Sequence, residues 1–297
     1  MQPLSDLAFG LSVALQPENV VYSLLGCVIG TIVGVLPGIG PIAAVSLLLP
    51  GTFGLDATKG VILQPPVFAD ATVFFSNDRD QVFSLDAETG RWRWSYDRES
   101  PEGFTVAGHG RPLFHEGNLY LGFSDGRLVC LGARGGDVRW SRSLTGGAKE
   151  YVDVDATPVL AGSVLYASSH AGGVFALTPE GGALQWRFPV TGASTVVASG
   201  ERIYFASARD GIHALDREGR LRWRQRLSAG SPGTPQVVER ALIVPFAVGG
   251  LYVVDRLTGR LIQRFNPGGG ISGPLRVTPD SLFALFNVGE LYAFTLR

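Results

Sequence analysis

The sequence predicts an all-β protein, a β-propeller of four-stranded antiparallel blades, preceded by an apolar helical membrane segment. The prediction comes from a repeated unit in the body, a high glycine content and an uneven distribution of charge. Glycine contributes 40 of the 297 residues and charged side chains only 17%, which favours short strands joined by tight turns. The net charge of −1 gives no general attraction to nucleic acid, so no nucleic-acid partner is expected.

The leader, residues 1–58, contains three charged side chains, Asp6, Glu18 and Asp56. Asn19 to Leu36 is an uncharged run of 18 residues. As a helix it would be about 27 Å long at 1.5 Å per residue, close to the bilayer core of about 30 Å. We therefore expect one transmembrane helix, then a break at Pro37–Pro41 and a short second apolar run. The alternative is a buried hairpin of two helices in a soluble protein.

Small residues recur every fourth position in this helix. Gly26, Gly30 and Gly34 would lie on one face and allow another helix to approach closely. Leu24-Leu25-Gly26-Cys27 also fits a lipobox, in which Cys27 would be lipidated. A signal peptide needs a positive n-region, and no Lys or Arg precedes Lys59, so a buried thiol is the favoured interpretation of Cys27.

The leader resembles the start of a known permease family. The stretch from Leu11 to Asp56, with its string GTIVGVLPGIGP over 30–41, is similar to the N-terminus of the TctA-type permease subunit of tripartite tricarboxylate transporters. The resemblance implies a many-helix permease in which the broken segment helps to form the substrate path. It ends near residue 58, and nothing later is apolar enough to supply further helices. A fragment of such a permease stays an alternative function.

The body, residues 59–297, is a repeat array. The anchor positions are separated by 46, 46, 38, 39 and 40 residues. They are Leu85, Leu131, Leu177, Leu215, Val254 and Phe294. Each unit has a strand after a Thr-Pro or Pro position, an alternating strand, a glycine turn and a strand leading to a D-x-x-T-G turn and a Trp. Four short strands every 40 or so residues are typical of a propeller blade, and the chain supplies five full units and a partial sixth.

The repeated residues are interpreted as structural. Asp86 and Gly90 mark the D-x-x-T-G turn. Glycines at the hairpins supply the positive φ of a tight turn: they are Gly126, Gly173, Gly211 and Gly250. Tryptophans at one repeat position are expected to pack between neighbouring blades: they are Trp94, Trp140, Trp186 and Trp223. Gln263 replaces Trp in the fifth unit, which predicts the weakest junction there.

The D-x-x-T-G-x-x-x-W pattern at Asp86–Trp94 resembles the PQQ-type propeller repeat, found in quinoprotein dehydrogenases and in non-enzymatic relatives. Over 61–297 the body is similar to the BamB-like family of the outer-membrane β-barrel assembly machinery, through Asp155-Ala-Thr-Pro-Val and the ending at Leu291–Arg297. The resemblance implies eight blades, no quinone and a periplasmic scaffold held at a membrane. With fewer blades here, we expect an incomplete ring whose last strand near Leu291–Leu296 is exposed.

Several motifs match catalytic patterns by letters only. Gly122-x-Ser124-x-Gly126 lacks the strand-to-helix turn of a nucleophile elbow, and Gly268-x-Gly270-x-x-Gly273 lacks a βαβ unit. Asp153 and Asp155 are interpreted as turn residues before a strand, and Cys130 as a core thiol. The four histidines do not have metal-ligand spacing: they are His109, His115, His170 and His213. We predict no catalytic residue, metal or cofactor.

The sequence thus predicts a non-enzymatic, membrane-tethered scaffold in a Gram-negative-type envelope, with the propeller in the periplasm. Its expected partners are other proteins, including outer-membrane assembly components, and no small-molecule substrate is expected. A PQQ-dependent dehydrogenase is the alternative from the enzyme class. That alternative would require a cofactor clamp, and the sequence has no adjacent Cys pair.

Overall fold

A computed structural model describes residues 65–77, 79–98 and 110–296. Residues 61–297 form one compact unit, and all the elements below belong to it. The predicted transmembrane helix, the packing glycines Gly26, Gly30 and Gly34, and Cys27 lie outside the described residues. So does His109. Within the described residues, no helix has the length and apolar character that crossing a bilayer requires.

The described residues form 23 strands in six antiparallel sheets, five with four strands and one with three. The first sheet contains β1 (Val67–Ala69), β2 (Thr72–Ser76), β3 (Gln81–Asp86) and β4 (Trp92–Asp97). The second contains β5 (Leu113–His115), β6 (Asn118–Gly122), β7 (Arg127–Gly132) and β8 (Val138–Ser143). The third contains β9 (Val159–Ala161), β10 (Val164–Ser169), β11 (Gly173–Leu177) and β12 (Leu184–Phe188).

The fourth sheet contains β13 (Val197–Ser199), β14 (Arg202–Ser207), β15 (Gly211–Asp216) and β16 (Leu221–Gln225). The fifth contains β17 (Gln236–Val238), β18 (Ala241–Phe246), β19 (Gly250–Asp255) and β20 (Leu261–Phe265). The sixth contains β21 (Arg276–Val277), β22 (Ser281–Leu285) and β23 (Leu291–Thr295). The prediction of repeated four-stranded antiparallel blades is confirmed, with the partial sixth unit in its predicted place.

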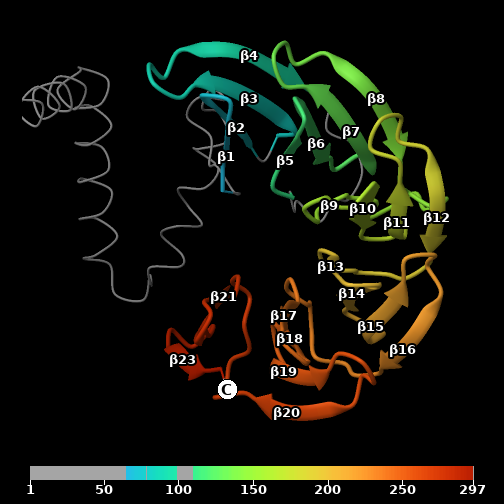
Figure 1. Cartoon of the computed structure of the whole chain (residues 1–297), viewed down its shortest axis with the longest axis vertical. Helices are drawn as coiled ribbons and strands as arrows, with labels where there is room; N and C mark the ends of the chain where they lie inside the picture. The colour runs from blue at the N-terminus through green and yellow to red at the C-terminus, as the bar shows by residue number, and fades with distance from the viewer. Residues whose placement is uncertain (1–64, 78, 99–109, 297) are drawn as a thin grey trace, which may run out of the picture. The chain divides into compact units, whose positions relative to one another are not determined.

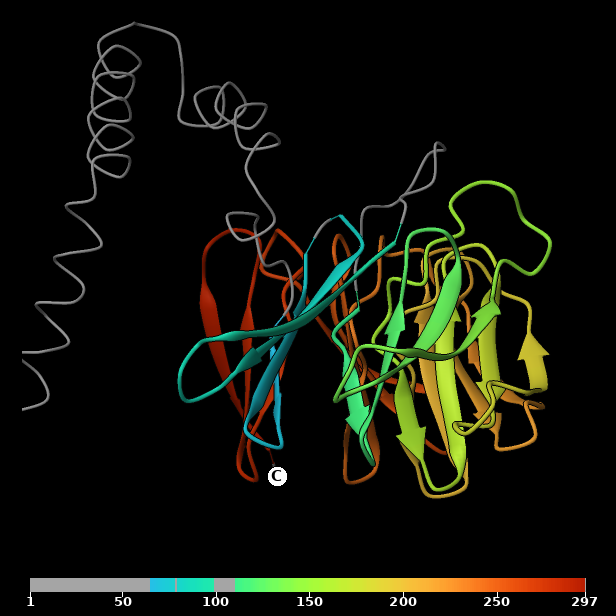
Figure 2. The same cartoon turned by 90° about the horizontal axis from the view of Figure 1, so that it is seen from above.

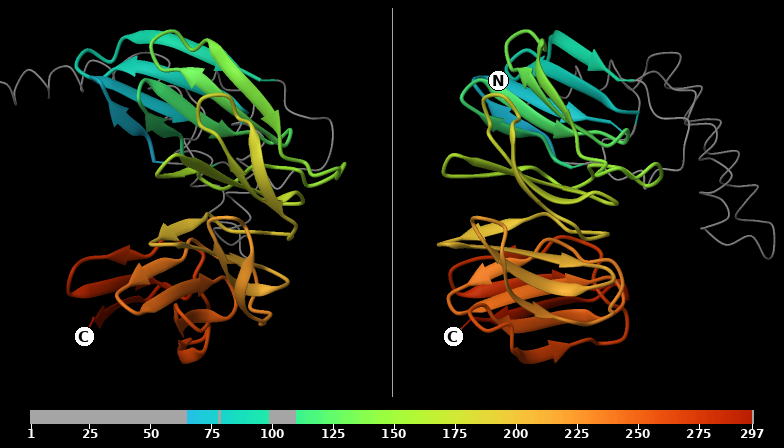
Figure 3. Two further views of the ribbon diagram at one scale, coloured as in Figure 1. Left: turned by 45° about the vertical axis from the view of Figure 1, so that its right-hand side comes forward. Right: turned by 90° about the vertical axis from the view of Figure 1, so that its right-hand side faces the viewer.

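The sheets follow one another around a centre, with their first strands inside and their fourth strands outside (Figure 1). Seen edge-on, the strands run between two faces that carry the loops (Figure 2). Consecutive sheets stack face against face (Figure 3). This arrangement follows from the sequence, because a blade with apolar residues on both faces needs a neighbour on each side to exclude water.

Close approach of two strands explains three of the turn glycines. Gly173, Gly211 and Gly250 each open the third strand of a sheet, with φ of 104°, 83° and 83°. A Cβ at these positions would lie 2.2–2.4 Å from a carbonyl oxygen of the fourth strand. Both the positive φ and the missing side chain are therefore needed for the fourth strand to pair.

A regular bulge recurs between the third and fourth strands, a feature that the sequence analysis missed. In the first sheet the register shifts between Ser84 and Leu85. The same shift precedes the anchor residue in the next four sheets. The anchor residues that define the repeat in the sequence are thus the points at which each outer strand bends.

Five buried clusters join consecutive sheets, and each draws side chains from both partners. Phe74 and Trp94 of the first sheet pack with Leu119 and Leu131 of the second, for example. None of these clusters joins the sixth sheet to the first within the described residues. The core of the body therefore lies at the junctions between blades, as the repeat pattern predicts.

Candidate protein-docking surface

The D-x-x-T-G turn is built around one carboxylate. Asp86 Oδ1 accepts hydrogen bonds from the Thr89 amide at 2.8 Å and the Thr89 hydroxyl at 2.7 Å, and Oδ2 accepts one from Arg93 at 2.7 Å. Arg93 and then Thr89 hold the pKa of Asp86 well below its usual range. Gly90 completes the turn with a φ of 67°. The carboxylate is therefore occupied in holding the hairpin.

Each tryptophan of the repeat reaches into the turn of the following sheet. Its indole Nε1 donates a hydrogen bond to a backbone carbonyl there. The pairs are Trp94 to Ala133 at 2.9 Å, Trp140 to Pro179 at 2.9 Å, Trp186 to Arg217 at 2.7 Å, and Trp223 to Arg256 at 3.0 Å. This satisfies the indole N–H where the ring is removed from water, so the tryptophans connect the blades by packing and by a directed bond.

A second set of glycines receives these rings, and the sequence analysis did not single it out. They are Gly136, Gly182, Gly219 and Gly259, with φ between 62° and 80°. A Cβ on any of them would lie 2.4–2.7 Å from a ring carbon of the preceding sheet's Trp. In the sequence, each of these glycines follows the Trp of the preceding unit by about one repeat. This spacing was the signal that could have identified the set.

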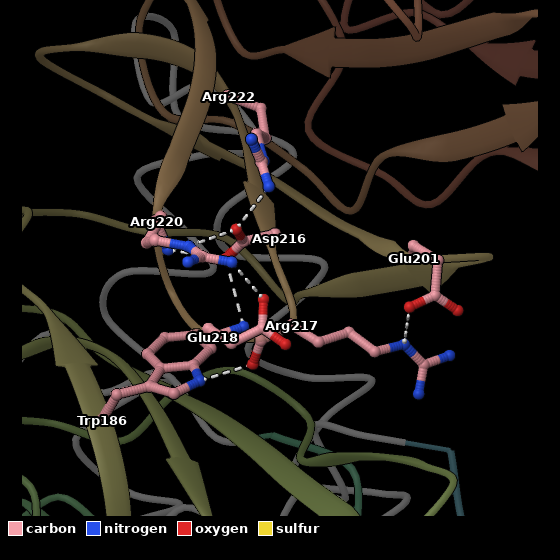
Figure 4. Close-up of polar contacts among 7 residues, drawn as sticks. All are labelled: Trp186, Glu201, Asp216, Arg217, Glu218, Arg220 and Arg222. Atoms are coloured by element: carbon pink, nitrogen blue, oxygen red, sulfur yellow. Dashed lines mark hydrogen bonds and ion pairs between the residues drawn. The ribbon is translucent and has the colours of Figure 1, made fainter.

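The junction of the third and fourth sheets shows how charge surrounds such a contact (Figure 4). Trp186 donates to the carbonyl of Arg217, next to Asp216. Asp216 Oδ2 lies 2.7 Å from Arg220 Nε and 2.9 Å from Arg222 Nη2. Burial tends to raise the pKa of Asp216, but the bonds and charges of these arginines outweigh it and lower that pKa.

The catalytic look-alikes have structural surroundings. Ser124 lies in the hairpin between β6 and β7, where its hydroxyl donates to Asp80 Oδ2 of the first sheet. Gly268 and Gly270 lie in the linker between β20 and β21, and both amides donate to Asn266 Oδ1. Neither motif has a helix beside it within the described residues.

His213 and Cys130 are core residues. His213 stacks on Phe205 with ring centroids 4.9 Å apart, and burial lowers its pKa to about 4. Burial likewise raises the pKa of the Cys130 thiol to about 11. His115 and His170 lie on different sheets, and in the described part of the chain no three His, Cys, Asp or Glu side chains gather closely enough to hold a metal ion.

The described residues border several cavities, and two of them lie between or beside the blades. One, of about 260 Å³, is bordered by the loops before the first strands of sheets three to five, with Asp155 and Thr234, and by hairpins that include His170. The other, of about 510 Å³, lies between the fifth and sixth sheets. Gln263, which replaces the repeated Trp, lines the larger cavity, so the fifth junction has open space where the other junctions have an indole ring.

The fold and these junctions define the body as a β-propeller of PQQ-type repeats. The family model for outer membrane protein assembly factor BamB matches residues 55–178 and 171–294, and the chain belongs to this family. The model of the tripartite tricarboxylate transporter TctA family matches residues 20–69. The two resemblances read from the sequence are thus confirmed.

Individual relatives include members of this family and a dehydrogenase. BamB of Shewanella oneidensis is 26% identical over 246 residues, covering 80% of this chain and 62% of the relative. The crystal structure of BamB from Moraxella catarrhalis aligns with a TM-score of 0.69 at 22% identity, covering 78% and 72% of the two chains. The 1-butanol dehydrogenase (cytochrome c) of Thauera butanivorans is 32% identical over 113 residues, 36% of this chain and 16% of the enzyme. The chain spans less than two thirds of the length of these curated relatives.

Proposed function

We propose that the chain is a non-enzymatic scaffold for protein–protein contact in outer-membrane protein assembly, tethered to a membrane by residues 1–58. The propeller, residues 59–297, would lie in the periplasm. In this role the body binds other proteins and has no cofactor, metal or small-molecule substrate.

One observation carries the proposal. The repeated polar and aromatic residues are all engaged within the blades, with Asp86 bonded to its own turn and Trp186 to the next sheet. The repeat motif therefore builds the scaffold and leaves the exposed strands and loops for contact. Membership of a family described as an outer membrane protein assembly factor supports this role.

The tether is supported by the uncharged run Asn19–Leu36, which as a helix has the length of a bilayer core. Since the resemblance to the TctA family covers only residues 20–69, we assign this segment an anchoring role.

The test is co-purification. The tagged full chain, produced in a Gram-negative strain lacking its own assembly factor of this family, is expected to fractionate with the membrane and to retain barrel-assembly components in mild detergent. A matched control is Trp186→Ala, which should weaken the blade junction and reduce the retained components. A chain that retains none of these components would contradict the proposal.

The dehydrogenase alternative has its own readout, because 36% of the chain aligns with a 1-butanol dehydrogenase. The purified chain is incubated with PQQ, Ca²⁺, a primary alcohol and a redox dye. Dye reduction that depends on PQQ would replace the scaffold role with an enzymatic one.

A further inference from the structure

Two arginines meet at the junction of the fourth and fifth sheets, where the β13–β14 hairpin lies beside the β19–β20 turn. Arg202 Nη1 donates to the carbonyl of Arg256 at 3.1 Å and to that of Leu257 at 2.6 Å. Arg256 Nη1 in turn donates to Ser199 Oγ at 3.0 Å. Ser199 is opposite Arg202 in the register of β13 and β14, and directly opposed side chains share a face of a sheet. The two guanidinium groups therefore lie close together.

Neither of these arginines pairs with a carboxylate of the described residues. The ion pairs in this part of the two sheets join other arginines: Arg217 with Glu201, Arg220 and Arg222 with Asp216, and Arg240 with Asp255. Arg202 and Arg256 are both half-buried, and Arg256 Nε is buried with no hydrogen-bond acceptor among the described residues. Removing a cation from water without a counter-charge is costly. The junction thus carries two positive charges that the described residues do not compensate.

The equivalent arginine of the fourth sheet shows what is missing. Arg217 occupies the same repeat position as Arg256, because the Trp of the preceding sheet donates to the carbonyl of each. Arg217 turns back to its own sheet, where its Nε lies 3.6 Å from Glu201 (Figure 4). In the fifth sheet the register places Arg240 at the position of Glu201. Arg256 therefore has a like charge where Arg217 has an acid, and it points to the fourth sheet instead.

The geometry of this arginine pair is fixed before any ligand arrives. The Arg256 carbonyl also accepts a hydrogen bond from Trp223 Nε1 at 3.0 Å, so the turn that carries Arg256 is held by the packed indole ring. The same carbonyl holds the guanidinium of Arg202. Gly200 and Leu257, beside the two arginines, are exposed. A ligand can therefore approach from solvent and bind groups that are already ordered, which reduces the entropic cost of binding.

Charge and shape favour a phosphate group as this ligand. A phosphate monoester carries about −1.5 to −2 charges at pH 7, which matches two guanidinium groups, whereas a carboxylate carries one. A carboxylate is planar and pairs best with one guanidinium. A tetrahedral phosphate has oxygens that can face Arg202 and Arg256 from their two sheets at once. The Ser199 hydroxyl accepts from Arg256 through its oxygen, and its own O–H can still donate to a phosphate oxygen.

We propose that Arg202, Arg256 and Ser199 form a binding site for a phosphate group, carried by a soluble phosphate ester or by a phospholipid headgroup. The two guanidinium groups supply the charge, and the Ser199 hydroxyl donates a further hydrogen bond. Binding gives Arg256 Nε and the unpaired charges an anionic partner. The inference goes beyond the scaffold role and does not depend on it, since no assembly component takes part.

The test is a phosphorus NMR titration of inorganic phosphate with the full chain in mild detergent, at constant ionic strength. The phosphate signal is expected to shift and broaden saturably. Arg256→Gln and Arg202→Gln should each weaken binding about tenfold or more, because each removes charge-assisted hydrogen bonds. Arg217→Gln is the matched control. It removes the arginine at the same repeat position of the fourth sheet, which already has Glu201 beside it, and should bind phosphate as the unchanged chain does.

A second pair of variants changes the hydroxyl position. Ser199→Asp places a carboxylate beside Arg256 as an internal counter-ion, so it should abolish phosphate binding and raise the urea midpoint of the chain without ligand. Ser199→Ala removes only the hydroxyl and should weaken binding about fivefold. Thermal unfolding verifies that all variants fold. Because Ser199→Asp adds a favourable charge pair, it tests the site even where an arginine variant is too unstable to measure.

Glycerol phosphate and a short-chain phosphatidylglycerol distinguish the two sources of the phosphate group. Tighter binding of the lipid assigns the site to a headgroup, and tighter binding of glycerol phosphate assigns it to a soluble ester; both results support the site.

Four results would overturn the inference: an absence of saturable phosphate binding, equal binding by Arg256→Gln or by Ser199→Asp, an equal loss in Arg217→Gln, and displacement of phosphate by acetate at equal concentration. The last result would indicate a site for carboxylates. Failure of the scaffold role is read separately, from the loss of co-purifying assembly components.

Discussion

Gly136→Ala, compared with Gly90→Ala, measures how strongly a blade depends on the indole ring of its neighbour. The two glycines occupy the same turn position in consecutive sheets, with φ of 73° and 67°. A Cβ at Gly136 would lie 2.7 Å from the Trp94 ring, whereas one at Gly90 has nothing within 4 Å. The pair therefore separates backbone strain from a steric clash between blades.

The magnitudes follow from these distances. A left-handed conformation costs an L-residue about 1–2 kcal/mol, and this cost applies to both variants. Contact between carbons is favourable at about 3.5–4.0 Å, so at Gly136 the ring must move by about 1 Å. Trp94 is only 8% exposed, and forcing extra volume into a packed site costs about 1–3 kcal/mol more. We expect about 1–2 kcal/mol for Gly90→Ala and about 2–5 kcal/mol for Gly136→Ala.

The assay is equilibrium unfolding of the full chain in urea, followed by tryptophan fluorescence. Trp94→Ala in the background of each glycine variant completes the comparison. Without the ring, the two glycine variants should become equally destabilising. Equal free energies of unfolding for Gly136→Ala and Gly90→Ala with Trp94 in place would refute the role of the ring contact.

Three further predictions concern other parts of the chain. Trp186→Ala should lower the free energy of unfolding by about 3 kcal/mol, as for other large-to-small changes. Trp186→Phe should cost less than the alanine variant and at least about 1 kcal/mol, because it keeps an aromatic ring but loses the bond to the Arg217 carbonyl and part of the ring volume. A loss below about 1 kcal/mol for the alanine variant would remove Trp186 from the interblade contact. Burial lowers the pKa of His213 in the folded state to about 4, against 6.5 for the free side chain. The contribution of the neutral ring to the free energy of unfolding is therefore complete above pH 6.5 and is lost as the pH falls towards 4, by about 3 kcal/mol in total. Urea titrations from pH 7 to 4 should show this loss, and His213→Phe should reduce it. The full chain should sediment with membranes and a 59–297 truncation should not; if both remain in the supernatant, the leader does not act as a tether.

The repeat register could be predicted from the sequence because each blade is a local unit. Hairpin turns such as Asp125-Gly126 and the alternating strand Asn118–Gly122 depend on residues close together in the chain, and the structure has strands at those positions. The anchor residues gave the spacing of the blades for the same reason. The three-stranded sixth sheet could also be predicted, since its third strand, Leu291–Thr295, is the last element of the repeat in the sequence.

Contacts between blades could not be read from the sequence in the same way. Trp94 and Gly136 are 42 positions apart, and the sequence singled out the tryptophan but not the glycine that receives it. The repeat spacing identifies equivalent residues in different blades. It does not predict which face of a strand contacts which part of the turn in the following blade. The cavity beside Gln263 likewise required the structure, although the missing Trp indicated a weak junction.

The sequence by itself determined the class of fold, the strand order within each blade and the glycine turns that open the third strands, because these depend on interactions over a few residues. The tertiary structure alone decided which side chains meet across the junctions and which carboxylates are engaged in turns. The physical reason is that a blade cannot bury its own faces, so the contacts of each residue there depend on a neighbour about 40 residues away.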